Sequence, residues 1–257
     1  MSRFPAIIFT SLILAWMPIA PSHAAQDTGA IEGAIIDAIA DPARPDGDRA
    51  QDENRKPLEV LTFAGVKPGD RVADFIPGGG YVTRLFSKIV GPSGHVYAVV
   101  PEELFKMRAG ADAAVKAIAA DPAYGNVTVL REPVNEFSAP EKLDLVWTSM
   151  NYHDLHDKFM GPANLAVLNK AIYDALKPGG VYLVLDHAAA KGTGLRDTET
   201  LHRIDPEVVK KEVTAAGFVL EATSDVLSNP DDDHTMKVFA SAIRGKTDKF
   251  IFKFRKP

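Results

Sequence analysis

The sequence of 257 residues contains no cysteine. This absence excludes disulfide bonds, metal sites built from thiolates and catalysis by a cysteine nucleophile. After residue 20 the sequence also has no apolar run long enough to cross a membrane. The chain that follows its N-terminal segment is therefore expected to be soluble.

A strong excess of charge of one sign is also missing. The formal net charge is -5 at pH 7, and basic residues are interspersed with acidic ones. Proteins that bind nucleic acid or an anionic membrane surface need concentrated positive charge, so neither partner is predicted. With 46% hydrophobic and 25% charged residues, the chain has the composition of a globular domain with a full core.

Residues 1–24 have the pattern of a secretory signal peptide. Arg3 provides a positive start, residues 6–20 are almost entirely apolar, and mostly small residues follow at positions 21–24. Cleavage is expected after Ala24, which predicts a periplasmic or secreted protein without a membrane anchor. An uncleaved anchor is the alternative, because an apolar run of this length just spans a bilayer if it is tilted.

Residues 25–56 are expected to form an N-terminal helical arm followed by a charged linker. Isoleucines at helical spacing give the arm one apolar side, and charged residues then dominate positions 44–56. A solvated linker is the plain interpretation of this charged run. The alternative is that Arg49 or Arg55 folds over the next domain and pairs with a carboxylate of a ligand.

Residues 57–257 are expected to form one domain in which strands alternate with helices. This alternation predicts an α/β fold with a doubly wound, mostly parallel seven-stranded sheet. The last two strands need no helix between them, so they are expected to form an antiparallel C-terminal hairpin around an insertion at residues 228–247. The predicted strands are residues 71–76, 95–100, 126–130, 143–148, 181–186, 218–226 and 249–255.

A proline and three glycines stand where the first predicted strand turns into a helix. Glycine adopts positive φ without steric cost and lets a ligand approach the bare backbone, so free N–H groups are expected to surround an open space. The carboxyl ends of parallel strands form the binding crevice of open α/β sheets. The alternative is a plain turn in which Asp74 caps the next helix. The residues expected to contact a ligand are Asp74, Pro77, Gly78, Gly79, Gly80 and Tyr81.

The order of these segments resembles the class I S-adenosylmethionine-dependent methyltransferases over about residues 55–256. The resemblance implies a Rossmann-like methyltransferase fold, S-adenosylmethionine as cofactor and a small-molecule acceptor. Within that family the chain looks most like a group of exported bacterial predicted methyltransferases that share Tyr152-His153-Asp154 and the stretch 244–248. The segments that carry the family resemblance are 66–74, Gly78-Gly79-Gly80, 143–147, 176–181 and Gly217-Phe218.

Two positions depart from the family pattern. Ile76 stands where the family turn has its first glycine, so the backbone is bulkier there. Val100 stands at the end of the second strand, where the family has an acid that accepts the ribose hydroxyls. Glu102 is expected to take this ribose-binding role, with Glu103 as the alternative, because both begin the following helix.

The loop after the fourth predicted strand carries the densest polar chemistry of the chain. In the methyltransferases that the chain resembles, such a loop faces both the methyl donor and the acceptor. His153 is the candidate general base, because a neutral imidazole accepts a proton near pH 7. Asp154 is expected to orient it or to bind the acceptor, beside Tyr152, and Asn151 is expected to contact the cofactor. The alternative is that these polar groups only cap the loop.

No metal site is predicted, although the same loop allows one. His153 and His156 are three residues apart and approach each other only in a helical segment, so a closed site needs a distant third ligand. Asp154 and Asp157 stand beside them in the loop. Asp186-His187 and His202 are distant candidates, and Asp186-His187 fits better as a second wall of the acceptor pocket.

The predicted function is methyl transfer from S-adenosylmethionine to a small acceptor. An exported binding protein that has kept the methyltransferase fold without its catalysis is the alternative, favoured by Val100 and by the export signal. A metal-dependent hydrolase built on the histidine and aspartate loop is the third possibility. The sequence does not identify the acceptor.

Overall fold

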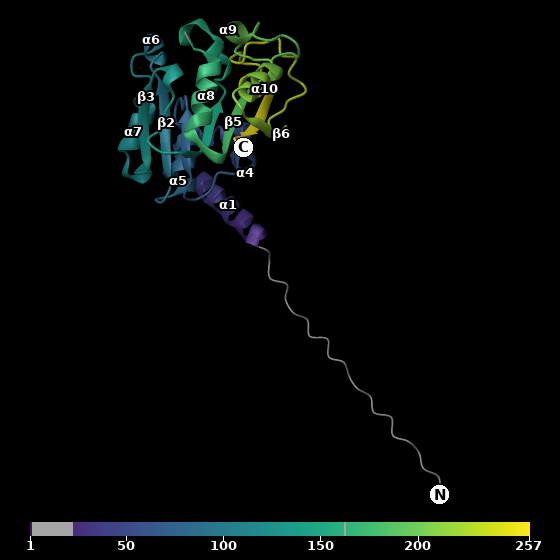
Figure 1. Cartoon of the computed structure of the whole chain (residues 1–257). Coiled ribbons are helices and arrows are strands. Elements are labelled where there is room, and N and C mark those ends of the chain that lie inside the picture. The colour runs from purple at the N-terminus through teal and green to yellow at the C-terminus, as the bar shows by residue number, and fades with distance from the viewer. Residues whose placement is uncertain (2–22, 162) are drawn as a thin grey trace.

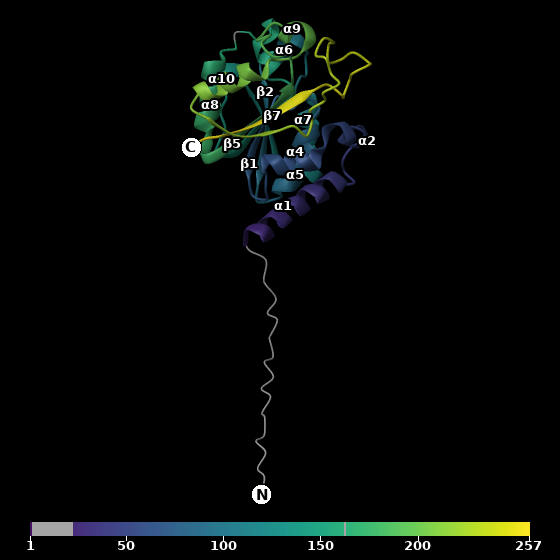
Figure 2. The same ribbon diagram turned by 90° about the vertical axis from the view of Figure 1, so that its right-hand side faces the viewer.

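The computed structural model describes residue 1, residues 23–161 and residues 163–257. The predicted signal peptide, residues 1–24, lies almost entirely outside these ranges. In the described part of the chain, a sheet of seven strands stands between two layers of helices (Figures 1 and 2).

The sheet has the strand order β3-β2-β1-β4-β5-β7-β6. Strands β1 to β5 are parallel, and β7 pairs antiparallel with both β5 and β6. This topology confirms the predicted fold class, including the antiparallel C-terminal hairpin. The strands are β1 (Arg71–Phe75), β2 (His95–Pro101), β3 (Val127–Glu132), β4 (Leu143–Ser149), β5 (Leu176–His187), β6 (Val219–Ser224) and β7 (Lys249–Arg255).

Helices cover both faces of the sheet, as Figure 2 shows. One face carries α1 (His23–Ala40), α4 (Pro57–Ala64), α5 (Tyr81–Val90) and α7 (Ala113–Ala120), and the other carries α8 (Leu165–Ala175) and α10 (Pro206–Ala215). None of the helices in the described residues combines the length and apolar character that a membrane span requires. The short helices are α6 (Leu104–Met107), α9 (Thr198–Leu201) and the 3₁₀ turns η1 (Pro122–Tyr124), η2 (Val134–Glu136), η3 (His153–His156) and η4 (Lys158–Met160).

The inner strands are buried on both sides, which explains why their sequences are apolar almost throughout. In β1 and β2 every residue after the first is buried. The edge strand β6 instead alternates between exposed and partly buried residues. The chain leaves β1 for β2 on one side and returns to β4 on the other, so the crevice of the sheet opens at the carboxyl ends of β1 and β4.

The charged segment at residues 42–56 is folded rather than a solvated linker. It forms two short helices, α2 (Asp46–Arg49) and α3 (Asp52–Arg55). The guanidinium of the buried Arg44 donates two hydrogen bonds, of 2.9 and 2.7 Å, to the carboxylate of Asp52. Because both charges find partners within the segment, it can pack closely instead of staying in water.

Candidate functional site

The glycine turn between β1 and α5 presents bare backbone at two of its three glycines. Gly78 and Gly79 are exposed, and a Cβ atom added at either one would meet no heavy atom within 4 Å. Gly80 has a different role, because a Cβ there would collide with the side chain of Ile118. Ile76, at the position of the missing first glycine, adopts a left-handed conformation with φ of 60°.

Asp74 is buried behind this turn and holds the beginning of α5. The hydroxyl of Thr83 donates a hydrogen bond of 2.6 Å to its Oδ2. Burial raises the pKa of Asp74 to about 6, although hydrogen bonds from Thr83 oppose the increase. The carboxylate thus stabilises the first turn of α5 from behind the glycine turn.

The charged segment at residues 42–56 covers the turn by contacting Tyr81. The Tyr81 hydroxyl donates a hydrogen bond of 2.6 Å to Asp52, and the guanidinium of Arg55 lies 4.4 Å from the centre of the Tyr81 ring. Arg55 therefore reaches the site, as one of the two alternatives for this segment predicts. Arg49 remains on the surface, paired with Asp46 at 3.0 Å.

Asn151 and Glu102, the other two predicted cofactor residues, occupy different surroundings. Asn151 is buried, donates a hydrogen bond of 3.0 Å to the carbonyl of Ile76 and bonds to Thr148, so it ties the glycine turn to the end of β4. The Glu102 side chain is 47% exposed and lies 3.4 Å from Arg131. The structure brings Asn151 to the turn and places Glu102 on the surface.

Two cavities that share lining residues open at the carboxyl ends of β4 and β5. The first is lined mainly by apolar groups, with Tyr81 at one wall. The second is lined by charged and polar side chains that include His187 and by apolar ones that include Phe239. We call them together the cleft. Glycines 78–80 do not line it, although their neighbour Tyr81 does. Both cavities are lined by Asn54, Arg55, Met150 and Lys249.

Two titratable side chains in the wall of the cleft have strongly altered proton affinities. Burial lowers the pKa of His187 well below its ordinary value, and the charges of His153, Lys249 and Arg203 lower it further. Burial also lowers the pKa of Lys249 to about 8. His187 Nδ1 lies 2.7 Å from the hydroxyl of Thr247, and Lys249 donates a hydrogen bond of 2.9 Å to the Thr247 carbonyl.

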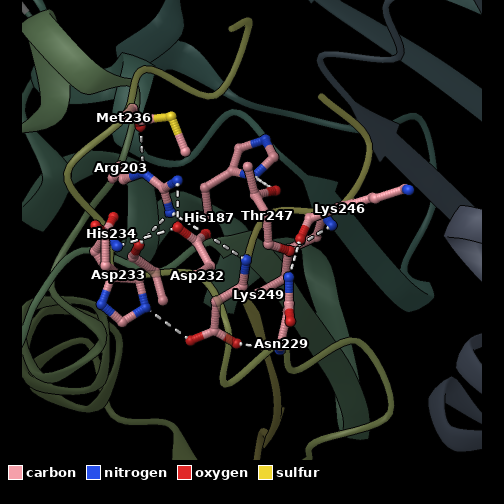
Figure 3. Close-up of polar contacts among 12 residues, drawn as sticks. His187, Arg203, Asn229, Asp232, Asp233, His234, Met236, Lys246, Thr247 and Lys249 are labelled. Carbon is pink, nitrogen blue, oxygen red and sulfur yellow. Dashed lines mark hydrogen bonds and ion pairs between the residues drawn. The ribbon is translucent and has the colours of Figure 1, made fainter. Parts of the chain in front are cut away.

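The insertion at residues 228–247 forms the outer wall of the cleft and contains no helix or strand. Figure 3 shows how it is held: the guanidinium of Arg203 lies against Asp232, and Thr247 lies between His187 and Lys249. Arg203 is fully buried. It is therefore a structural cation that holds the insertion in place.

The loop Tyr152-His153-Asp154 lies behind the cleft wall rather than in it. Tyr152 is fully buried, and its hydroxyl donates a hydrogen bond of 2.9 Å to Glu212. Burial alone would lower the pKa of His153, but the carboxylates of Asp186 and Asp154 raise it to about 10. This shift favours the protonated imidazole, which argues against the predicted role of His153 as a general base.

Comparison with known proteins finds curated relatives that are named as C-methyltransferases. No family model matches the chain. The ubiquinone/menaquinone biosynthesis C-methyltransferase UbiE of Teredinibacter turnerae is 30% identical over 146 residues, which cover 56% of this chain and 53% of that protein. The chain thus spans about half the length of the curated relatives it matches.

Solved structures match over more of the chain. A SAM-dependent methyltransferase from Aquifex aeolicus has a TM-score of 0.58 at 19% identity, and the match covers 88% of this chain and 98% of that one. The glycopeptide N-methyltransferase MtfA complexed with S-adenosylmethionine has a TM-score of 0.52 at 16% identity, with 80% and 87% covered. At such identities the likeness concerns the fold. The chain has the fold of the class I S-adenosylmethionine-dependent methyltransferases, as its sequence predicts.

Proposed function

We propose that the protein transfers a methyl group from S-adenosylmethionine to a small acceptor. The observation that carries the proposal is the exposed backbone at Gly78 and Gly79, beside a cleft at the carboxyl ends of β4 and β5. The name of the curated relatives, which are C-methyltransferases, and the fold of the solved methyltransferases support the same chemistry.

The residues around the turn fit the methionine part of this donor. The space above Gly78 and Gly79 is open, so their backbone is accessible to a ligand. Among the described residues, no carboxylate lies within 4.0 Å of the charged end of Arg55 or Lys249. Removing a cation from water without a counter-ion is costly, so the half-buried Arg55 and the buried Lys249 are the candidates for binding the donor carboxylate.

The residues at the end of β2 do not offer the acid that the ribose normally meets in this fold. Val100 is fully buried, and Glu102 is paired with Arg131 at the surface. The carboxylate of Glu103 accepts a hydrogen bond of 3.0 Å from the backbone N–H of Val134. Donor binding is therefore expected to rely mainly on the methionine end, with a lower affinity than a carboxylate-bound ribose would give.

S-adenosylmethionine supplies a methyl group on a positively charged sulfur when it is bound. The chain would accelerate transfer chiefly by aligning the acceptor in the cleft and excluding water. Where the acceptor arrives protonated, His187 is placed to accept the proton. Burial lowers the pKa of His187, whereas neighbouring carboxylates raise that of His153, whose ring centre is 6.1 Å away, so His187 is the better candidate of the two for the base.

Calorimetric titration of the purified protein with S-adenosylmethionine and S-adenosylhomocysteine tests the donor site. Saturable binding is expected, and Gly79→Asp should abolish it by adding bulk and negative charge at the open backbone. Gly47→Asp is the matched control, because Gly47 is also exposed and a Cβ added there would meet no heavy atom within 4 Å, but it lies in α2. Equal affinity in Gly79→Asp and the wild type would refute this donor site.

The alternative is a binding protein that keeps the fold without catalysis, and the lack of a free acid at the ribose position favours it. The two functions differ in turnover. Precursors of ubiquinone and menaquinone are the first acceptors to assay, because the curated relatives are named for those pathways. Release of S-adenosylhomocysteine in the presence of an acceptor, lost in His187→Ala, supports the enzyme. Donor binding without turnover on any acceptor tried favours the binding protein.

We also propose that the protein acts outside the cytosol, after cleavage of the chain following Ala24. The support is the pattern of residues 1–24 alone. N-terminal sequencing of the protein from the periplasm or the culture medium should begin at Ala25. A chain that retains Met1 and sediments with membranes would contradict this proposal.

A further inference from the structure

Three side chains that are suited to bind a metal ion converge behind the cleft. His153 and Asp154 lie in η3, whereas His202 directly follows α9. Asp154 Oδ1 lies 3.2 Å from Nε2 of His153 and 3.6 Å from Nδ1 of His202. Each residue offers a ligand atom within 4.8 Å of those of the other two.

These distances suit a metal ion with tetrahedral coordination. Zinc bonds of about 2.0–2.2 Å to nitrogen or oxygen, in tetrahedral geometry, separate neighbouring ligand atoms by about 3.3 Å. The two distances to Asp154 lie on either side of this value, at 3.2 and 3.6 Å. Small side-chain rotations would therefore bring His153, Asp154 and His202 onto one ion.

A fourth residue, Asp186, orients the first ligand from behind. Its fully buried carboxylate lies 2.9 Å from Nδ1 of His153 and accepts a hydrogen bond of 2.7 Å from the His153 backbone N–H. With Nδ1 engaged, the ring directs Nε2 toward Asp154. Histidines that bind metals usually have such a carboxylate on the nitrogen that does not touch the ion.

The backbone at His202 is strained in a way that serves the same convergence. Its φ is 56°, in the left-handed region that residues other than glycine rarely adopt. Such a conformation is energetically costly and persists where the surroundings impose it, often at functional sites. Here it ends α9 and places the imidazole against Asp154 on one side and Phe239, a residue of the cleft wall, on the other.

The charges around the three ligands favour a cation. Among the described residues, the only basic groups within ion-pair distance of Asp154 and Asp186 are the two histidines. Asp157, also buried, interacts electrostatically with this group, and its Oδ1 has no hydrogen-bond partner in the described part of the chain. Three carboxylates in a largely enclosed space therefore exceed the positive charge available to them.

We propose that His153, Asp154 and His202 bind one divalent transition-metal ion, best matched by Zn²⁺, and that Asp186 orients His153 for it. Two imidazoles and one carboxylate are ligands that zinc prefers, and three protein ligands leave one position for water or for Asp157. Binding at Nε2 requires the neutral imidazole. The ion ties η3 to the segment after α9 and so fixes the wall of the cleft. Zinc binding can be measured whether or not the protein transfers methyl groups.

Titration of the chelator-treated protein with ZnCl₂, followed by calorimetry, tests the site. One Zn²⁺ per chain is expected to bind with saturation. His202→Ala and Asp154→Asn should each weaken binding at least about tenfold, and Asp186→Asn should weaken it by about ten- to a hundredfold through the orientation of His153. Circular dichroism of each variant establishes that it is folded before its affinity is compared.

Two histidine variants provide matched controls. His156 belongs to the same turn but pairs with Glu212 at 3.2 Å, and His95 lies on β2 beside Thr128. His156→Ala and His95→Ala should bind Zn²⁺ as the wild type does. Absence of saturable binding to the wild type would overturn the proposal, and the contacts would then be a plain network of hydrogen bonds. Undiminished binding by folded His202→Ala would overturn it as well.

Discussion

Arg203 and Asp232 form an ion pair from which water is excluded. Two guanidinium nitrogens of Arg203 donate hydrogen bonds of 2.8 and 3.0 Å to the Asp232 carboxylate, and both side chains are 0% exposed. The same guanidinium donates to the carbonyls of Ala188, just after β5, and Met236, in the insertion. One cation thus joins the sheet to the wall of the cleft (Figure 3).

Removal of one partner of this pair should strongly destabilise the protein. Asp232→Ala leaves the guanidinium buried without its counter-ion, and the free energy of unfolding should fall by about 3–5 kcal/mol. Urea denaturation measures the loss. Asp233→Ala is the control, because the adjacent Asp233 is exposed and bonds to Thr235. A similar loss in both variants would show that the segment, rather than the pair, is responsible.

The two glycines that end the turn should respond differently to alanine. Gly80→Ala places a Cβ against Ile118 at a φ of 79°, and should lower the free energy of unfolding by about 1–3 kcal/mol. Gly79→Ala should change it by less than about 0.5 kcal/mol, because its Cβ meets open space. Combining Gly80→Ala with Ile118→Val should restore part of the loss. Equal effects at both glycines would contradict the separate roles given to them.

The arrangement of the sheet was predictable because each inner strand carries its own local signal. Continuous apolar segments, glycine turns and intervening helical periodicity are all short-range patterns. The folding of residues 42–56 was not predictable in this way. It depends on which acid meets Arg44, and composition shows eight charged residues without showing that Asp52 accepts both hydrogen bonds.

The place of the His153 loop in the sheet was predictable, but the proton affinity of His153 was not. The loop with His153 lies at the end of β4, as the sequence predicts. The pKa of His153, however, depends on Asp186, which is 33 residues away in the sequence. Lys249 was not predicted as a residue of the site, although its position at the start of the last strand indicated it. An antiparallel last strand begins at the edge where the parallel strands end, so its first residue, Lys249, belongs to the crevice.

Lys249 should make stability depend on pH in an unusual direction. Burial lowers its pKa in the folded protein from 10.5 to about 8. Between these values the unfolded chain binds a proton that the folded protein has released, so the folded state gains stability as pH rises. Below pH 8 the cost of burying the ammonium is fully present. The gain across the window is up to about 3 kcal/mol.

Urea denaturation at about pH 7 and about pH 10.5, for the wild type and Lys249→Met, measures this gain. Methionine keeps most of the side-chain volume and removes the charge. The free energy of unfolding of Lys249→Met should therefore exceed that of the wild type at the lower pH, and the two values should become similar at the higher pH. Lys106→Met, at an exposed position on α6, controls for loss of any lysine. Parallel pH profiles for the wild type and Lys249→Met would show that Lys249 is solvated like a surface lysine, and it would then no longer be a candidate for an unpaired cation in the cleft.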